Sequence, residues 1–266
     1  MPLKKNLQPQ SLLPKCIKVY PLQGMILNSV GLSGPGTDDL LSREIWQKKT
    51  SPFVISFMAV SGLLVDRLEE ARLFVARLKT ELPKFQTLIM VQVNMSCPNT
   101  GHQTEELAQE AFAILKLFTE LDVPIDLKIN VLFPVNLLIE IADSNLCDVI
   151  TVSNTIPYGA CPNDINWKRL FWWRIFWGFR SPLHKLGGGG LSGTPILPVV
   201  LQKIRQIKKA GIKKPLKGCG GIMSRQAVIK MYQAGVQAIE FGSVAIIRPW
   251  KIRKMIRLAR KLFQNN

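Results

Sequence analysis

The chain has 266 residues, 47% of them hydrophobic, and carries 35 Lys and Arg residues against 18 Asp and Glu, a net charge of +17. This length suits one large α/β domain with a sizeable core. No uncharged apolar run is long enough to cross a membrane as a helix, and the five scattered cysteines argue against a zinc site or a disulfide framework.

Short apolar, β-branched runs alternate along the chain with longer helical stretches. Strands are expected at residues 52–57, 88–93, 125–129, 148–152, 215–218 and 238–241. Helices are expected at residues 64–82, 104–121, 135–144, 195–210, 224–234 and 250–263. Strands that alternate with crossover helices predict a parallel sheet covered by helices.

Two architectures share this order of elements, the open doubly wound sheet and the closed (β/α)8 barrel. Polar and glycine residues follow most expected strands, at residues 94–97, 128, 153–155, 220–221 and 242–243. A barrel collects its site from many strand ends, whereas an open sheet concentrates it at one switch point. We therefore predict an α/β fold of the (β/α)8 TIM-barrel class, with about six of its eight strands, in a single domain over residues 1–266.

The segment after the second expected strand combines amides with a thiol. Asn94 and Asn99 can both donate and accept hydrogen bonds, which suits a planar heterocycle with alternating C=O and N–H groups. Cys97, between them, can remove a proton as a thiolate. The alternative is an ordinary loop with a buried cysteine.

Lys128 lies inside an apolar strand, and glycine-rich turns occur later in the chain. A lysine facing a barrel interior needs an anion or an electron-rich ring as partner; alternatively it reaches solvent from an edge strand. The turns at residues 187–193, 218–221 and 242–243 each precede a helix, and such turns can hold a phosphate. Two of them follow the last two strands, where barrels commonly bind phosphate.

Together these segments resemble the dihydroorotate dehydrogenase family. The matching motifs, in chain order, are Asn28-Ser29-Val30-Gly31-Leu32, Asn94-Met95-Ser96-Cys97-Pro98-Asn99, Lys128, Ser153-Asn154-Thr155, Gly189-Gly190-Leu191-Ser192-Gly193, Gly220-Gly221-Ile222 and Gly242-Ser243. The similarity extends from about Leu7 to Trp250. The combination is specific, although each motif alone is not.

The resemblance implies an FMN-dependent barrel that oxidises dihydroorotate to orotate in pyrimidine synthesis, without a metal site. Cys97 would be the catalytic base. The implied substrate-binding residues are Asn28, Gly31, Leu32, Asn94, Asn99, Asn154 and Thr155. The implied FMN-binding residues are Asn94, Lys128, Ser153, Gly193, Gly220, Gly221, Gly242 and Ser243.

The electron acceptor is left open between quinone, fumarate and NAD reached through a partner subunit. A cysteine at position 97 is typical of the cytosolic classes of the family, whereas the motif at residues 189–193 is more similar to that of the quinone-reducing class. We expect a cytoplasmic protein that forms homo-oligomers and does not bind nucleic acid. The charge excess at residues 4–18, 168–185, 203–217 and 251–261 indicates either solvated helix faces or an anionic partner.

Family members begin with two further strands, and residues 7–10 resemble the segment just after the second of these. A longer gene product, a partner chain that supplies these strands, or an inactive remnant would each account for this. The insert near residues 157–186 is rich in aromatic and basic residues, most densely at 171–179. It would contact the inner face of a membrane or a partner, or serve as an active-site lid.

Three other functions remain open on the sequence alone. A tRNA dihydrouridine synthase is another FMN barrel with a catalytic cysteine, and the basic charge would suit tRNA. Residues 189–193 and 248–250, however, follow the dehydrogenase pattern. The other two are a dihydropyrimidine dehydrogenase domain and a flavin-free remnant that binds a partner. The absorbance spectrum of the purified chain would distinguish the remnant, which has no flavin, from the enzymes.

Overall fold

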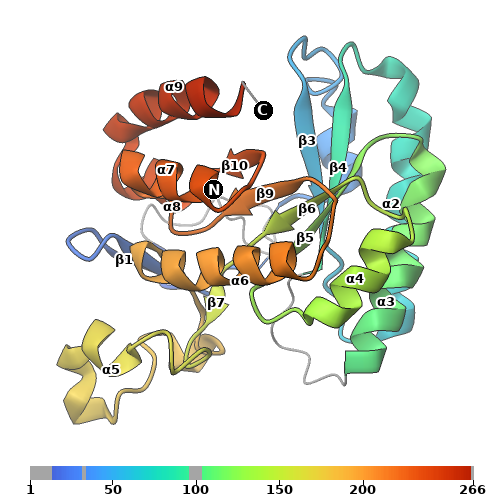
Figure 1. Cartoon of the computed structure of the whole chain (residues 1–266). Coiled ribbons are helices and arrows are strands. Elements are labelled where there is room, and N and C mark those ends of the chain that lie inside the picture. Colours follow the sequence, from blue (N-terminus) through green and yellow to red (C-terminus); the bar gives the residue numbers. More distant parts are fainter. Residues whose placement is uncertain (1–13, 32–33, 96–103, 265–266) are drawn as a thin grey trace. The chain divides into compact units, whose positions relative to one another are not determined.

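The structure, a computed structural model, describes residues 14–31, 34–95 and 104–264 (Figure 1). These residues form two compact units, which we treat separately. Unit 1 contains the described residues of 34–128 and 133–150, and unit 2 contains 14–31, 129–132 and 151–264.

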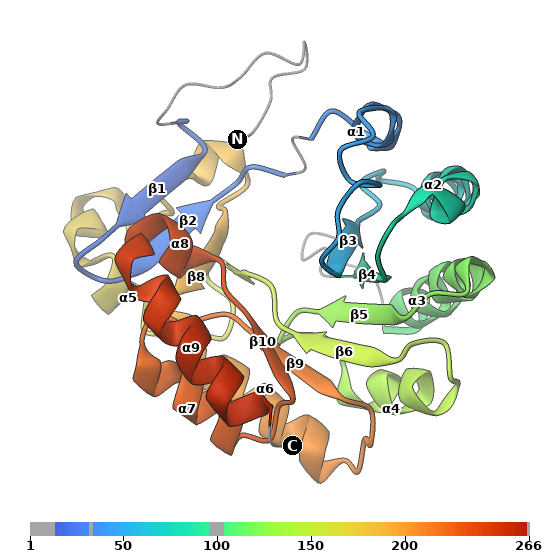
Figure 2. The ribbon, with the colours of Figure 1, turned by 90° about the horizontal axis from the view of Figure 1, so that it is seen from above.

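Unit 1 is built from parallel strands and the helices that come after them. Its strands are β3 (Phe53–Phe57), β4 (Ile89–Asn94) and β5 (Ile125–Ile129), and its helices are α1 (Thr37–Ser42), α2 (Leu64–Glu81), η1 (Leu82–Lys84), α3 (Thr104–Phe118), η2 (Thr119–Leu121) and α4 (Val135–Asp143). β4 pairs in parallel with both β3 and β5. Helices α2 and α3 lie against one another on one side of these strands (Figure 2).

An aromatic cluster holds α2 and α3 against β3. The ring of Phe57 lies 4.7 Å from that of Phe74 and 5.2 Å from that of Phe118, measured between centroids. All three side chains are buried. Large aromatic side chains bury much apolar area, so this cluster is a main source of stability for unit 1.

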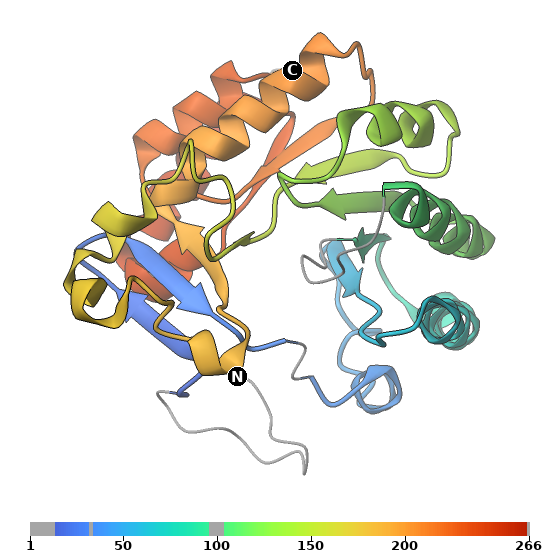
Figure 3. The ribbon, with the colours of Figure 1, turned by 90° about the horizontal axis from the view of Figure 1, so that it is seen from below.

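Unit 2 also contains parallel strands. β6 (Val149–Val152) enters it from unit 1 along the chain, and β9 (Leu216–Cys219) and β10 (Ala238–Glu240) pair in parallel. Its helices are α5 (Trp167–Leu170), η3 (Trp172–Trp177), η4 (His184–Leu186), η5 (Thr194–Ile196), α6 (Leu197–Lys209), α7 (Arg225–Gln233), α8 (Ser243–Ile247), η6 (Pro249–Lys251) and α9 (Ile252–Phe263). Helices α6, α7 and α9 lie on the same side of β9 and β10 (Figure 3).

The parallel strands have the order β10-β9-β6-β5-β4-β3. The six strands expected from the sequence are therefore present, each within one or two residues of its expected position, with crossover helices between them. The predicted fold class, an α/β chain with six of the eight strands of a TIM barrel, is confirmed. This order places sequential strands beside one another, as in a barrel rather than a doubly wound sheet.

A second, antiparallel sheet in unit 2 was not predicted. It has the order β1-β2-β8-β7, with β1 (Ile17–Tyr20), β2 (Met25–Asn28), β7 (Ile156–Pro157) and β8 (Gly190–Gly193). β1 and β2 form a hairpin, and β2 pairs with β8 (Figure 2). The glycine-rich segment expected only as a turn before a helix thus also contains a strand.

Candidate functional site

In unit 1, two predicted site residues meet at the carboxyl ends of neighbouring strands. Asn94 ends β4 and is the direct Cα partner of Lys128 on β5. The amide nitrogen of Met95 also donates a hydrogen bond to the Lys128 carbonyl oxygen at 2.9 Å. Both side chains are half-buried, so polar groups from two strands converge where a ligand could reach them.

A buried polar chain continues this face of unit 1. Ser56 Oγ donates to Gln92 Oε1 at 3.3 Å, and Gln92 Nε2 donates to Asp126 Oδ2 at 2.7 Å. Asp126 is fully buried and Gln92 nearly so. Because side chains alternate along a strand, Gln92 lies on the same face as Asn94, and Asp126 on the same face as Lys128. The sequence interpretation missed Gln92 and Asp126, although a polar residue at every second position of an apolar strand is a readable signal.

In unit 2, three predicted substrate residues lie close together around Gly190. Asn28 is its Cα partner in the β2–β8 pairing, and a side chain at this glycine would come within 2.3 Å of Thr155 Oγ1. The carboxamide oxygen of Asn154 accepts a hydrogen bond from the Thr155 amide at 2.8 Å. The close approach of the Thr155 side chain explains why position 190 is a glycine.

The end of β6 brings Ser153 to β9. Its amide nitrogen donates to the Cys219 carbonyl oxygen at 2.7 Å, and its hydroxyl donates to the Asn154 carbonyl oxygen at 3.0 Å. Ser153 is fully buried. Further along, Lys217 Nζ lies 2.8 Å from Glu240 Oε1 across β9 and β10, an ion pair that the sequence interpretation did not anticipate.

Packing accounts for some of the predicted phosphate-binding glycines. At Gly221, where φ is +75°, a Cβ atom would lie 2.6 Å from the backbone nitrogen of Leu197, at the start of α6. At Gly193 a Cβ would lie 2.2 Å from the Gly24 carbonyl oxygen on the adjoining hairpin. Both glycines are therefore required by neighbouring backbone, whatever ligand they also contact.

Gly242 differs, since a Cβ there would meet nothing within 4 Å. The next residue, Ser243, donates from its hydroxyl to Ser192 Oγ at 2.9 Å. β10 pairs with β9, so the Gly242 turn and the Gly220 turn come after adjacent parallel strands at one edge. Packing against neighbouring atoms therefore does not account for the glycine at position 242.

The remaining predicted residues lie elsewhere. Gly31 is exposed, with φ at +64° and no atom near its would-be side chain. Leu32, Cys97 and Asn99 fall outside the described residues. Across the parts of the chain that are described, no group of three or more His, Cys, Asp or Glu side chains could hold a metal ion. The same residues contain no helix with the length and apolar character needed to cross a membrane.

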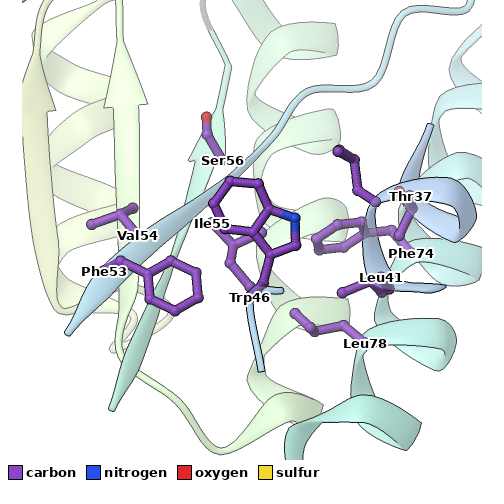
Figure 4. A pocket seen from close by; sticks show the side chains of 10 residues that line it. Thr37, Leu41, Trp46, Phe53, Val54, Ile55, Ser56, Phe74 and Leu78 are labelled. Atoms are coloured by element: carbon purple, nitrogen blue, oxygen red, sulfur yellow. The ribbon is translucent and has the colours of Figure 1, made fainter. Parts of the chain in front are cut away.

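Unit 1 also contains an apolar cavity of about 260 Å³ (Figure 4). Ten residues line it: Thr37, Leu40, Leu41, Trp46, Phe53, Val54, Ile55, Ser56, Phe74 and Leu78. The buried Trp46 Nε1 beside it has no hydrogen-bond partner. None of the lining side chains can titrate at neutral pH, so the cavity does not supply an acid or a base.

The comparisons with known proteins decide the family. The family model described as dihydroorotate dehydrogenase matches residues 5–262, nearly the whole chain. The chain belongs to the dihydroorotate dehydrogenase family. The resemblance inferred from the strand-end motifs is thus confirmed, and with it the class of enzyme, an oxidoreductase.

Individual relatives agree with this assignment. The chain is 30% identical over 254 residues to the catalytic subunit of dihydroorotate dehydrogenase B (NAD(+)) of Caldicellulosiruptor saccharolyticus, covering 92% of this chain and 73% of the relative. The equivalent subunit of Streptococcus pneumoniae is 25% identical over 85% of the chain and 68% of its own length. Dihydroorotate dehydrogenase A (fumarate) of Lactobacillus delbrueckii subsp. bulgaricus is 28% identical over 84% and 67%.

Proposed function

We propose that this chain oxidises dihydroorotate to orotate in de novo pyrimidine synthesis, with FMN as the hydride acceptor. The observation that carries the proposal is the family match over residues 5–262. Relatives at 25–30% identity are named dihydroorotate dehydrogenases of two kinds. The polar strand-end residues of each unit would supply the hydrogen-bonding groups that such a reaction needs.

Amide and hydroxyl side chains would bind the substrate. Dihydroorotate is a ring of alternating C=O and N–H groups, and carboxamides can donate to the former and accept from the latter. Asn94 in unit 1, and Asn28, Asn154 and Thr155 in unit 2, are our candidates among the described residues. Gly31, Leu32 and Asn99 complete the proposed set.

FMN would be held by Asn94, Lys128, Ser153, Gly193, Gly220, Gly221, Gly242 and Ser243. The open space at Gly242 and the adjacent turns after β9 and β10 support a phosphate site there. A lysine ammonium such as that of Lys128 favours electron-rich atoms of a flavin ring. When bound, the flavin supplies the acceptor for the hydride.

Cys97 is the proposed base. Its thiolate would take the proton from C5 of dihydroorotate, while the asparagines hold the ring in place. A free thiol has a pKa of about 8.5, close enough to neutral pH for general-base catalysis.

The electron acceptor distinguishes the classes of dihydroorotate dehydrogenase. Assays with fumarate, with quinone, and with NAD⁺ together with a candidate partner subunit would identify it.

The test of the base is Cys97→Ala. This change should leave the FMN content intact, because other strands would hold the cofactor, and it should slow flavin reduction by dihydroorotate by roughly 10²–10⁴-fold. Cys97→Ser should keep some activity at high pH, since a serine hydroxyl in the same place can also act as a base, though a weaker one. Anaerobic stopped-flow bleaching of the flavin measures both. Reduction of Cys97→Ala at the parent rate would remove this residue from the mechanism.

The test of the cofactor is chemical. Protein denatured after reconstitution should release FMN, identified by chromatography of the supernatant. Release of FAD, or of no flavin at all, would contradict the proposed cofactor.

A further inference from the structure

The aromatic insert of unit 2 has a packed inner layer. Phe171 is fully buried, and its ring lies 5.8 Å from Tyr20, 5.2 Å from Tyr158 and 6.3 Å from Trp167. Burial raises the pKa of both tyrosines, which keeps them neutral. These contacts explain why part of the segment is aromatic, because it has its own small core.

The small aromatic core does not explain the outer layer of the insert, which consists of Trp172, Ile175 and Phe176. Trp172 is 68% exposed, Ile175 57% and Phe176 91%. The helix η3 that carries them is held in place: the Arg174 amide donates to the Phe171 carbonyl oxygen at 2.8 Å, and Tyr158 Oη donates to the Phe179 carbonyl oxygen at 2.7 Å. Three large apolar side chains are thus presented to solvent on a fixed support, which is typical of an interaction site.

Positive charge surrounds this outer layer. Lys168, Arg169, Arg180 and Lys185 are all exposed in the same insert. Residues 165–266 contain 21 of the 35 Lys and Arg residues but only one of the 18 acidic residues, Glu240. That glutamate is paired with Lys217. A complementary partner must therefore be strongly anionic.

A hollow of about 380 Å³ lies beside Phe176. Arg174, Arg180 and His184 line it together with Phe176 and Gly178. Arg174 Nε donates to the Arg180 carbonyl oxygen at 3.2 Å, and His184 Nδ1 lies 3.1 Å from the Ser181 carbonyl oxygen. Two guanidinium groups and an imidazole around one hollow are suited to a phosphate group.

We propose that residues 168–185 dock on an anionic lipid bilayer, with Trp172, Ile175 and Phe176 inserted at the interface and a lipid phosphate bound near Arg174, Arg180 and His184. Tryptophan and phenylalanine partition to the headgroup level, and nearby lysines and arginines bind anionic headgroups. An RNA partner would use flat rings for stacking, whereas Ile175 offers none. The mixture of aliphatic and aromatic side chains therefore favours lipid.

The test is co-sedimentation of the full chain with vesicles. Phosphatidylcholine vesicles that also contain phosphatidylglycerol should bind it, whereas pure phosphatidylcholine vesicles should not. Added salt should weaken binding, because screening shortens the reach of the charges. Arg174→Gln with Arg180→Gln should reduce binding about thirtyfold, from the usual contribution of each basic residue near an anionic surface.

The apolar contribution is tested separately. Phe176→Ser alone should weaken vesicle binding and leave the fold intact, since its side chain is 91% exposed. Trp172→Ser with Ile175→Ser should weaken it further. Brominated lipids should quench the tryptophan fluorescence of the parent chain more than that of Trp172→Phe.

Matched control variants distinguish binding through this site from nonspecific binding through exposed apolar or basic side chains elsewhere. Leu88→Ser and Val65→Ser remove side chains that are 81% and 75% exposed in unit 1. Arg253→Gln with Lys254→Gln removes two exposed cations from α9. These controls should change binding by no more than about twofold, with circular dichroism confirming the fold of each variant.

Several results would overturn the proposal. Equal binding to both kinds of vesicle would show that anionic headgroups do not drive binding. Equal losses of binding in the control variants would show that residues 168–185 are not the docking site. Binding to single-stranded RNA but not to anionic vesicles, lost in Phe176→Ser, would assign the surface to nucleic acid instead.

Discussion

At the scale of single residues, Glu81 shows how strongly local partners set ionisation. This side chain, at the end of α2, is only 4% exposed and accepts hydrogen bonds from Lys84, Gln47 and Arg77 at 2.9, 2.9 and 2.6 Å. The hydrogen bonds to the charged form, from Lys84 first, lower the pKa of Glu81 from 4.5 to about 2. The carboxylate therefore links α2 to the loop that contains Gln47.

We expect a pH-dependent stability from this group. Its folded pKa lies below its unfolded pKa, so its contribution is complete above pH 4.5 and is lost as the pH falls toward about 2. Glu81→Gln should therefore be less stable than the parent at pH 7, and the difference should shrink at pH 3. Urea unfolding of both chains at the two pH values measures it. A difference that stays constant with pH would contradict the assignment.

The sequence indicated only some of the polar groups at these strand ends. Asn94 and Lys128 were proposed as site residues from their motifs, and the pairing of β4 with β5 makes them neighbours. The buried hydrogen bond from Gln92 to Asp126 was missed, because strand order and register are needed to know that the two side chains meet. Motifs mark residues one strand at a time, whereas a polar network depends on pairing between strands.

At the scale of elements, the turns after β9 and β10 contain glycines for different reasons. Gly221 lies against the backbone of Leu197 with positive φ, so packing with α6 requires it. Gly242 faces open space. A glycine that packing does not require is the better candidate for direct contact with a ligand.

This contrast gives a paired prediction. Gly221→Ala should destabilise the protein by about 2 kcal/mol or more, through positive φ and overpacking. Gly242→Ala should leave the unfolding midpoint unchanged and weaken FMN binding roughly tenfold, because a methyl group would occupy the path of the phosphate. Thermal unfolding of the apoprotein and a fluorescence titration with FMN measure the two effects. Unaltered FMN affinity in Gly242→Ala would remove this turn from the cofactor site.

Helices α2 and α3 are joined by a buried ion pair. Arg67 Nε lies 2.6 Å from Glu110 Oε1, and the Nη2–Oε2 distance is 2.8 Å, with side chains only 6% and 10% exposed. The remaining Arg67 nitrogen donates to the carbonyl oxygens of Ser61 and Gly62. The guanidinium thus also holds the loop before α2.

Removing one partner of this ion pair should lower the free energy of unfolding more than replacing both partners with apolar residues. Arg67→Met alone should destabilise the protein by about 3–5 kcal/mol, because it leaves a buried carboxylate without its bidentate partner. Arg67→Met combined with Glu110→Leu should recover part of that loss. Urea unfolding of the single and double variants gives the coupling, and strictly additive losses would show that the two charges do not depend on one another.

The sequence predicted the parallel elements well and the antiparallel sheet not at all. The strands β3, β4, β5 and β9 are each followed by a helix of at least nine residues. The hydrophobic pattern therefore changes from the period of a strand to that of a helix, which can be recognised in the sequence. The hairpin strands β1 and β2 have four residues each, and β8 consists of Gly190-Leu191-Ser192-Gly193. Glycine is depleted in strands, and β8 is held by partners far along the chain, which no local pattern can reveal.

At the scale of the whole molecule, the parallel sheet has two end strands. Among the described residues, β3 and β10 each pair with one neighbour only. The TIM-barrel class has eight strands and no edges. Val54 on β3 is 43% exposed, and its neighbours line the apolar cavity of unit 1. An apolar edge strand invites pairing with another strand.

The last prediction concerns this edge. Fusing the first two strands of a related dihydroorotate dehydrogenase upstream of the chain should raise the melting temperature and the affinity for FMN, because an added strand would satisfy the free edge of β3 and cover Val54. The same segment with a proline at every second strand position cannot pair, and serves as the control. Calorimetry and FMN fluorescence measure the two quantities. If the 266-residue chain alone already binds FMN at nanomolar strength and unfolds cooperatively, with no gain from the added strands, the free edge has no part in holding the cofactor.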